Sequence, residues 1–311
     1  MLIHKQENDL AIPDALKFKA ELRPLAFADK EEKKWESYPI DRHQALVRDD
    51  TDEPLAIVGN RYEPTQYYDI AEKQMQGLEK SGLLKQSNFI CYDYMYDNGA
   101  RWKRDVCLTD LTIEPIVGDL VQFNQTAKSS HDGSLCNTTD STPKKLSCTN
   151  GCLSAIWQLI FRFRHTQNFD VENLVSIFNA STEHFYEMEP YFKSMANTKI
   201  SVKDVELALK QTICKRRKTK KKNIDHKEKL LGWLIGQYKK EAQTLDNTVW
   251  AFYNALTNWA THPELYDYKE DAKMHSVLLE QALQCYYFYN HHNGIKLLLI
   301  QLEVILIFNV F

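Results

Sequence analysis

The stretch that decides the fold, residues 118–165, reads GDLVQFNQTAKSSHDGSLCNTTDSTPKKLSCTNGCLSAIWQLIFRFRH. Residues 120–123 favour a strand, and residues 130–133 supply turn-forming side chains. Residues 135–139 can return as a second strand, and residues 149–151 are small capping residues in front of an apolar helical period. The stretch therefore predicts strand, turn, strand and helix, the helix with an apolar face of Ile156, Leu159, Ile160 and Phe163.

A second hairpin precedes this stretch. Residues 89–96 alternate as a strand, and Asn98-Gly99 forms a tight turn because both residues accept positive φ. Residues 102–108 return, and residues 111–117 extend the pattern to the turn at Gly118. We expect an α+β fold with a curved antiparallel sheet, a meander of about four to six strands, with packed helices and a helical C-terminal part.

Four regions follow from the patterning of the whole chain. Residues 1–40 are charged and irregular, with short helices at 14–21 and 29–36. Residues 41–170 form the sheet domain, including a helix at 66–81 that Gly82 caps. Residues 171–290 are helical, with a break near Pro190 and a last helix at 273–289. Residues 291–311 form an apolar tail, which is either a packed helix or strand or a non-native reading frame.

Composition sets limits on function. The chain has 311 residues and a net charge of -3, so no whole-chain charge indicates nucleic acid or membrane. Seven scattered cysteines and a polar first ten residues favour reduced thiols in a cytoplasm, and we expect no membrane attachment. Neither a P-loop nor a G-x-G-x-x-G motif is present, which disfavours nucleotide hydrolysis.

The strongest local charge is the run KRRKTKKK at residues 215–222, in which seven of the eight residues are basic. Such a run displaces counterions from a phosphate backbone, which predicts nucleic-acid contact. A solvated loop between two helices explains the same run, so both interpretations stay open.

The hairpin of residues 89–108 interleaves aromatic and basic residues. Tyr92, Tyr94 and Tyr96 share one face because a strand has period two, and three cations, Arg101, Lys103 and Arg104, follow the turn. Aromatic rings stack on exposed bases while cations follow the phosphates. The alternative is that the tyrosines pack against helices.

Two other patterns resemble a metal site and a catalytic triad, but their residues do not support either interpretation. Cys148 and Cys152 supply two of the four ligands that a structural zinc site needs, and Cys136, His131 and His165 could complete the set only if the fold gathered them. No second Cys pair is present, so we expect no metal and no cofactor. The adjacent residues of Ser130-His131-Asp132 diverge in direction, which favours a turn with side-chain hydrogen bonds over a catalytic triad. We therefore expect no catalytic residues and no enzymatic activity.

Several short motifs together resemble a phage and plasmid-like family, domain of unknown function 932. They are Ile57-Val58-Gly59-Asn60-x-Tyr62, Asp97-Asn98-Gly99-Ala100-Arg101, Ser129-x-His131-Asp132-Gly133-Ser134, Leu146-Ser147-Cys148-x-Asn150-Gly151 and His165. The resemblance extends over about residues 41–289 and excludes the basic run and the tail. It implies a mobile-element origin and assigns no activity. The order of elements is also similar to that of single-strand annealing proteins of the Rad fifty-two type, which is an analogy of topology.

These observations predict a non-catalytic, phage-type protein that binds and anneals single-stranded DNA in recombination or replication. Its expected partners are single-stranded DNA, further copies of the chain that could form a ring, and a phage exonuclease or host protein. The expected nucleic-acid-binding residues are Arg101, Lys103, Arg104, Tyr94, Tyr96, Lys128, Lys144, Lys145, Arg162, Arg164, Lys215, Arg216, Arg217, Lys218, Lys220, Lys221 and Lys222. The alternative is a factor that modulates a host protein through Trp250, Tyr253 and Trp259.

Overall fold

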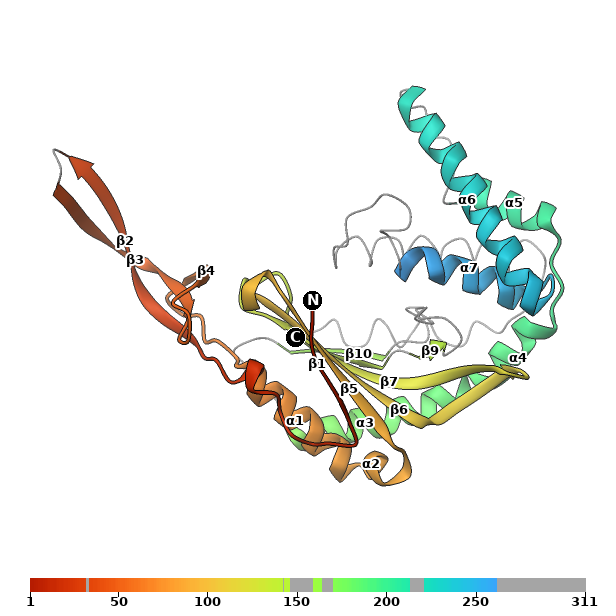
Figure 1. The fold of residues 1–311 in the computed structure, drawn as a ribbon, viewed down its shortest axis with the longest axis horizontal. Coiled ribbons are helices and arrows are strands. Elements are labelled where there is room, and N and C mark those ends of the chain that lie inside the picture. The colour runs from red at the N-terminus through yellow and green to blue at the C-terminus, as the bar shows by residue number, and fades with distance from the viewer. Residues whose placement is uncertain (32–33, 142, 146–158, 164–169, 213–220, 262–311) are drawn as a thin grey trace. The chain divides into compact units, whose positions relative to one another are not determined.

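The computed structural model describes residues 1–31, 34–141, 143–145, 159–163, 170–212 and 221–261 (Figure 1). It confirms the expected α+β class with a helical C-terminal part. The chain divides into two compact units. One contains residues 1–111, 123–141 and 160–182, and the other contains residues 112–122, 142–159 and 183–311. The apolar tail and the predicted last helix lie outside the described residues.

The central sheet contains the predicted meander. Its order is β1 (Leu2–Glu7), β5 (Phe89–Tyr96), β6 (Arg101–Ile116), β7 (Asp119–Ser130), β8 (Asn137–Ser141) and β10 (Leu159–Phe163), and β9 (Lys144–Lys145) pairs with β7. The turn η2 (Asp97–Gly99) joins β5 to β6, with Asn98 at φ 54° and Gly99 at φ 104°. Gly118 turns β6 into β7 at φ 83°. Both turns use the residues that the sequence predicted for them.

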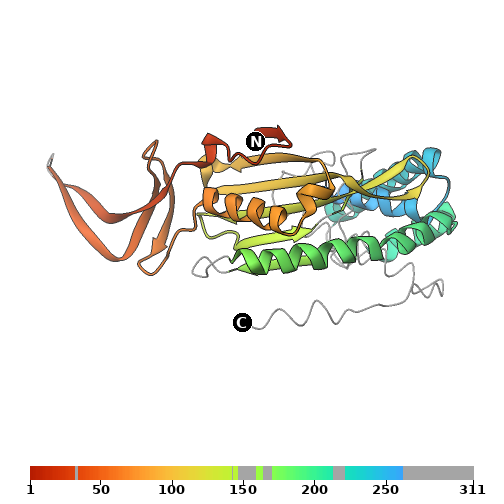
Figure 2. The same ribbon diagram turned by 90° about the horizontal axis from the view of Figure 1, so that it is seen from below.

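Helices α1 (Tyr67–Lys80) and α3 (Val171–Glu187) lie side by side along one face of the sheet (Figure 2). Their close approach depends on Gly77, where an added Cβ would lie 2.9 Å from Phe178 and 3.0 Å from Leu174. Gly82 follows α1 at φ 79°, as expected of a helix cap, and leads into the short α2 (Leu83–Gln86). We call the surface of the sheet beneath α1 and α3 the helix face.

The N-terminal 40 residues are largely strands, which corrects the expectation of an irregular segment with two helices. Besides β1, β2 (Ala20–Glu31) pairs with β3 (Lys34–Arg48), and β3 pairs with β4 (Pro54–Gly59) to form a second sheet. Only the 3-10 turn η1 (Asp14–Leu16) remains of the first predicted helix. The charged residues of this segment match helix propensity, but cross-strand pairing over the length of β2 and β3 overrides it.

The helical part of the chain is interrupted at the break predicted near Pro190. Helix α3 ends at Glu187, and α4 (Glu189–Asn197) starts with Pro190 in its first turn. Then follow α5 (Val202–Gln211), α6 (Lys221–Leu245) and α7 (Val249–Thr261), of which α5 has the predicted capping box from Ser201 to Asp204. Helix α7 contacts α4 and α6, and the Trp250 indole donates a hydrogen bond of 2.6 Å to Asp119 at the start of β7.

The helix predicted from the apolar spacing of residues 156–163 is wrong over its described part. Leu159–Phe163 is strand β10, which pairs with β8. The sequence LIFRF of this strand is too short to distinguish a period of two from a period of 3.6, so both fit it. The rest of the predicted helix lies outside the described residues.

Candidate nucleic-acid interface

The register of the β5–β6 hairpin gathers the predicted aromatic and basic residues on one face. Tyr94 pairs with Lys103, and Tyr96 pairs with Arg101. Residues directly opposite each other in an antiparallel pair point to the same side of the sheet. We call the surface formed by Tyr92, Tyr94, Tyr96, Arg101 and Lys103 the tyrosine face; it lies opposite the helix face.

Side chains on the tyrosine face reach solvent, whereas those beneath the helices do not. Tyr96 is 37% exposed and the Lys103 side chain is 32% exposed. The Lys103 ammonium lies 5.3 Å from the centre of the Tyr94 ring. An aromatic ring beside a partly exposed cation offers a base-stacking surface and a phosphate contact at neighbouring points.

Arg104 does not belong to this interface, and its prediction as a phosphate contact is corrected. It is adjacent to Lys103, so it points to the helix face, where its exposed fraction is 0%. Its Nε and Nη2 donate hydrogen bonds of 3.0 Å to the two carboxylate oxygens of Asp93. Trp102 Nε1 donates a third, of 3.1 Å, to Asp93. Arg104 is therefore a core residue held by a buried ion pair.

The cations on the tyrosine side of the sheet have carboxylate neighbours. Lys103 lies 2.8 Å from Asp105, a buried residue that also accepts a hydrogen bond of 2.7 Å from Thr126. Lys128 lies 2.7 Å from Asp140, which is buried as well. A phosphate group must compete with these carboxylates for each lysine. A phosphate contact to such a lysine therefore contributes less binding free energy than a contact to an unpaired cation.

Sequence reasoning missed one cation of this region. Lys5 of β1 pairs with Tyr92, and its ammonium lies 6.0 Å from the Tyr92 ring and 3.0 Å from Glu7. The alternating LIHKQE of β1 carries a strand signal, but the polar composition of the N-terminus favours an irregular segment and hides it.

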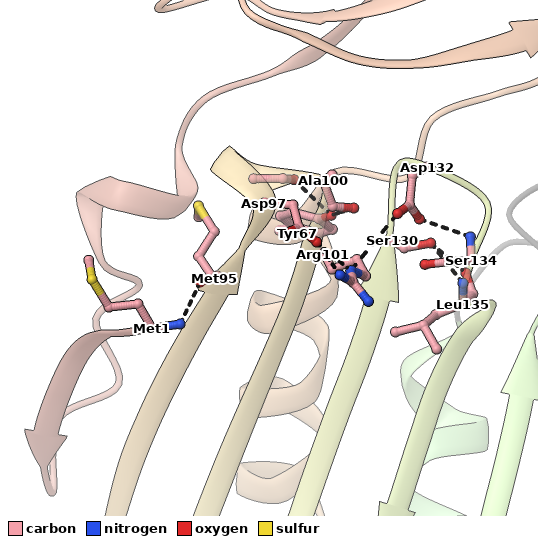
Figure 3. Close-up of polar contacts among 11 residues, drawn as sticks. Met1, Tyr67, Met95, Asp97, Ala100, Arg101, Ser130, Asp132, Ser134 and Leu135 are labelled. Carbon is pink, nitrogen blue, oxygen red and sulfur yellow. Dashed lines mark hydrogen bonds and ion pairs between the residues drawn. The ribbon is translucent and has the colours of Figure 1, made fainter. Parts of the chain in front are cut away.

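At the turn end of the hairpin, Arg101 lies between two carboxylates (Figure 3). It forms an ion pair with Asp97 and lies 3.9 Å from Asp132. The loop that carries Asp132 is a turn with side-chain to backbone hydrogen bonds, as predicted. The Asp132 carboxylate accepts from the Ser134 amide at 2.8 Å, and Ser130 Oγ accepts from the Leu135 amide at 2.9 Å.

A buried aromatic cluster supports this corner from the helix face. Tyr67 donates from its hydroxyl to the carbonyl oxygens of Gly99 at 3.0 Å and Ala100 at 2.9 Å. Its ring stacks on His131 at 4.1 Å and on Trp102 at 5.4 Å between ring centres. The His131 amide also donates a hydrogen bond of 2.7 Å to the Ala100 carbonyl. Residues from motifs far apart in the sequence thereby meet at one place and fix the backbone that presents Arg101.

Ionisation in this corner follows from burial and charge. Burial raises the pKa of Tyr62 to about 12, with the negative charge of Asp132 as a second cause. For Asp132, partial burial opposes ionisation, yet hydrogen bonds from Ser134 and Ser130 and the charge of Arg101 leave its pKa below the usual value. At neutral pH the corner therefore holds a neutral tyrosine and an ionised aspartate.

The remaining predicted contacts are dispersed or lie outside the described residues. Lys144 and Lys145 form β9, and Arg162 is exposed on β10. Lys221 and Lys222 begin α6. Arg164, Lys215, Arg216, Arg217, Lys218 and Lys220 lie outside the described residues.

The three aromatic anchors of the alternative function are corrected to core residues. Trp250 and Trp259 are fully buried, and Tyr253 is 2% exposed. Trp250 stacks on Tyr253 and packs against Phe192 at 5.0 Å between ring centres. Because these side chains are buried within the helical part, they are not available to anchor a partner protein.

Metal ligands and membrane spans can be judged only over the described part of the chain. There, no cluster of three or more His, Cys, Asp or Glu side chains could hold a metal ion. Cys91 and Cys136 are free thiols, while Cys148, Cys152 and His165 lie outside the described residues. No described helix has both the length and the apolar character needed to cross a bilayer.

A family model described as a domain of unknown function (DUF932) matches residues 54–283, well over half of the 311 residues. The chain belongs to this family. The match begins with β4, so β1, β2 and β3 precede it, and it includes the β5–β6 hairpin, the Asp132 loop and α7. No curated protein and no solved structure matches the chain.

Proposed function

We propose that this DUF932 protein binds single-stranded DNA on the tyrosine face and anneals complementary strands in phage-type recombination or replication. The observation that carries the proposal is the register that puts Tyr92, Tyr94 and Tyr96 beside Arg101 and Lys103 on one side of the hairpin, where Tyr96 and Lys103 are partly exposed to solvent. Unpaired bases present π-faces that stack on such rings, whereas bases in a duplex are already stacked on each other. The proposed partner is therefore a single strand.

Stacking and charge have separate sources in this proposal. Lys103 and Arg101 have carboxylate neighbours, so the tyrosines contribute most of the affinity on the sheet. The basic run at residues 215–222 has no acidic residue within it and supplies most of the phosphate contacts. The contribution from stacking is then insensitive to salt, whereas the contribution from phosphate contacts is strongly sensitive to it. Assembly of several copies along a strand would repeat both parts.

The test is fluorescence anisotropy with a labelled single strand and its duplex, across a series of salt concentrations. The proposal predicts tighter binding to the single strand and an affinity that falls as salt rises. A complementary-strand annealing assay then measures the activity itself. Absence of binding at low salt, where phosphate contacts are strongest, would contradict the proposal, as would equal affinity for the duplex.

A further inference from the structure

The helix face of β8 is polar although it is buried. Asn137, Thr139 and Ser141 alternate along the strand and are 0–3% exposed. They face the helices because Ser141 pairs with Gln125, and Gln125 points away from its neighbour Thr126, whose side chain bonds Asp105 on the tyrosine side. A strand side covered by helices is ordinarily apolar. This one has no apolar residue, so its hydrogen-bonding groups need partners inside the protein.

The two helices above it each contribute one polar residue to an otherwise apolar stripe. In α1, Gln74 lies one turn from the buried residues Ala71 and Leu78. In α3, Ser181 lies between Phe178 and Phe185, and all three are buried. The contact of Gly77 with Phe178 brings these stripes together. Polar groups from α1, α3, β7 and β8 thus lie along one seam, which we call the polar seam: Gln74, Gln125, Thr139, Ser141 and Ser181.

Part of the seam is satisfied by direct hydrogen bonds. Gln125 Nε2 donates to Ser141 Oγ at 2.8 Å. Four other side-chain oxygens are buried and have no hydrogen-bond partner among the described residues: Gln74 Oε1, Gln125 Oε1, Thr139 Oγ1 and Ser181 Oγ. Buried polar atoms in folded proteins are nearly always paired, with protein or with ordered water. Each of the four atoms therefore needs a partner that the described residues do not supply.

The chemistry of these four atoms identifies that partner. The two amide oxygens only accept hydrogen bonds, and the two hydroxyl groups can donate. Water donates two hydrogen bonds and accepts two, and a buried water typically has two to four polar partners. We propose that the polar seam between α1, α3, β7 and β8 is a binding site for ordered water, which links both helices to the sheet. This site is independent of the tyrosine face, on the other side of the sheet.

Thr139→Val and Ser181→Ala test the proposal because each removes one hydroxyl with little change in volume. If water occupies the seam, each variant loses a hydrogen bond, and the midpoint of urea denaturation of the full chain falls. If the hydroxyl has no partner, the substitution removes a buried unsatisfied group, and the midpoint stays or rises, which would overturn the proposal. Ser129→Ala is the matched control, because Ser129 donates a hydrogen bond of 2.7 Å to Asn137 and its removal lowers the midpoint in either case.

A high-resolution crystal structure of the wild-type protein gives a second measurement that does not depend on the variants folding. The proposal predicts ordered density within hydrogen-bond distance of at least two of the four oxygens. A well-defined seam with direct protein partners for these oxygens and no such density would overturn it.

Discussion

Each face of the β5–β6 hairpin carries a cation, a carboxylate and an aromatic ring, but the set on one face is buried and the set on the other is partly exposed to solvent. On the helix face, Arg104 and Asp93 form a fully buried ion pair beside Trp102. On the tyrosine face, Lys103 and Asp105 form a pair whose lysine is partly exposed beside Tyr94. One residue of offset in a strand decides which cation stabilises the core and which is available to a ligand. Cation type and sequence position alone therefore do not identify a binding residue.

The largest expected effect comes from breaking the buried pair. Asp93→Ala leaves the Arg104 guanidinium buried without its carboxylate and removes the acceptor of Trp102 Nε1. We expect the free energy of unfolding to fall by about 3–5 kcal/mol, measured by urea denaturation. Glu206→Ala, which breaks the exposed pair with Lys210, is the control and should lower it by less than about 1 kcal/mol. Equal effects would contradict the contrast between the two environments.

Replacing the basic residues of the run 215–222 with glutamine tests how charge is divided between the run and the sheet. Both faces of the hairpin stay intact in this variant. The slope of log affinity against log salt should become shallower by about 0.7 for each phosphate that the variant no longer neutralises. Retention of the full wild-type slope in anisotropy titrations would assign the phosphate contacts to the sheet instead.

The burial of the Cys91 thiol on the helix face predicts a pH dependence of the free energy of unfolding. Burial raises the pKa of its thiol to about 12 from a usual 9.0, so the folded state keeps the proton while the unfolded state loses it between these values. The stability contributed by the neutral thiol is present below pH 9 and is lost as pH rises toward 12. Between about pH 9 and 11, wild type should lose about 1.4 kcal/mol per pH unit more than Cys91→Ala in urea denaturation. Parallel pH profiles would place the thiol in contact with solvent.

The smallest expected effect is on the cations of the tyrosine face. Arg101→Ala combined with Lys103→Ala should weaken single-strand binding by less than about tenfold, since both side chains already have carboxylate neighbours worth about as much as a surface ion pair. Anisotropy at fixed salt measures this. A weakening as large as that of the run variant would show that these carboxylates do not compete with phosphate.

The hairpin and its register could be predicted from the sequence because local signals agree there. Asn98-Gly99 fixes the turn, and alternation fixes which side each residue takes. The same alternation separates Lys103 from Arg104, so grouping them as one basic cluster is an avoidable error. The strands of residues 20–40 could not be predicted, because pairing between long strands outweighs their charged, helix-like composition. The polar seam was also hidden, since the residues NTTDS of β8 resemble an exposed strand until α1 and α3 cover them.

The central claim is that Tyr94 stacks on an unpaired base, and Tyr94→Ala compared with Tyr94→Phe tests it most directly. Both substitutions remove the hydroxyl, but only alanine removes the ring. The account predicts that Tyr94→Ala loses about 1–3 kcal/mol of single-strand affinity at every salt concentration, with an unchanged salt slope, and that Tyr94→Phe binds nearly as wild type. Wild-type affinity of Tyr94→Ala in a folded protein would contradict the account and remove the tyrosine face from the binding site.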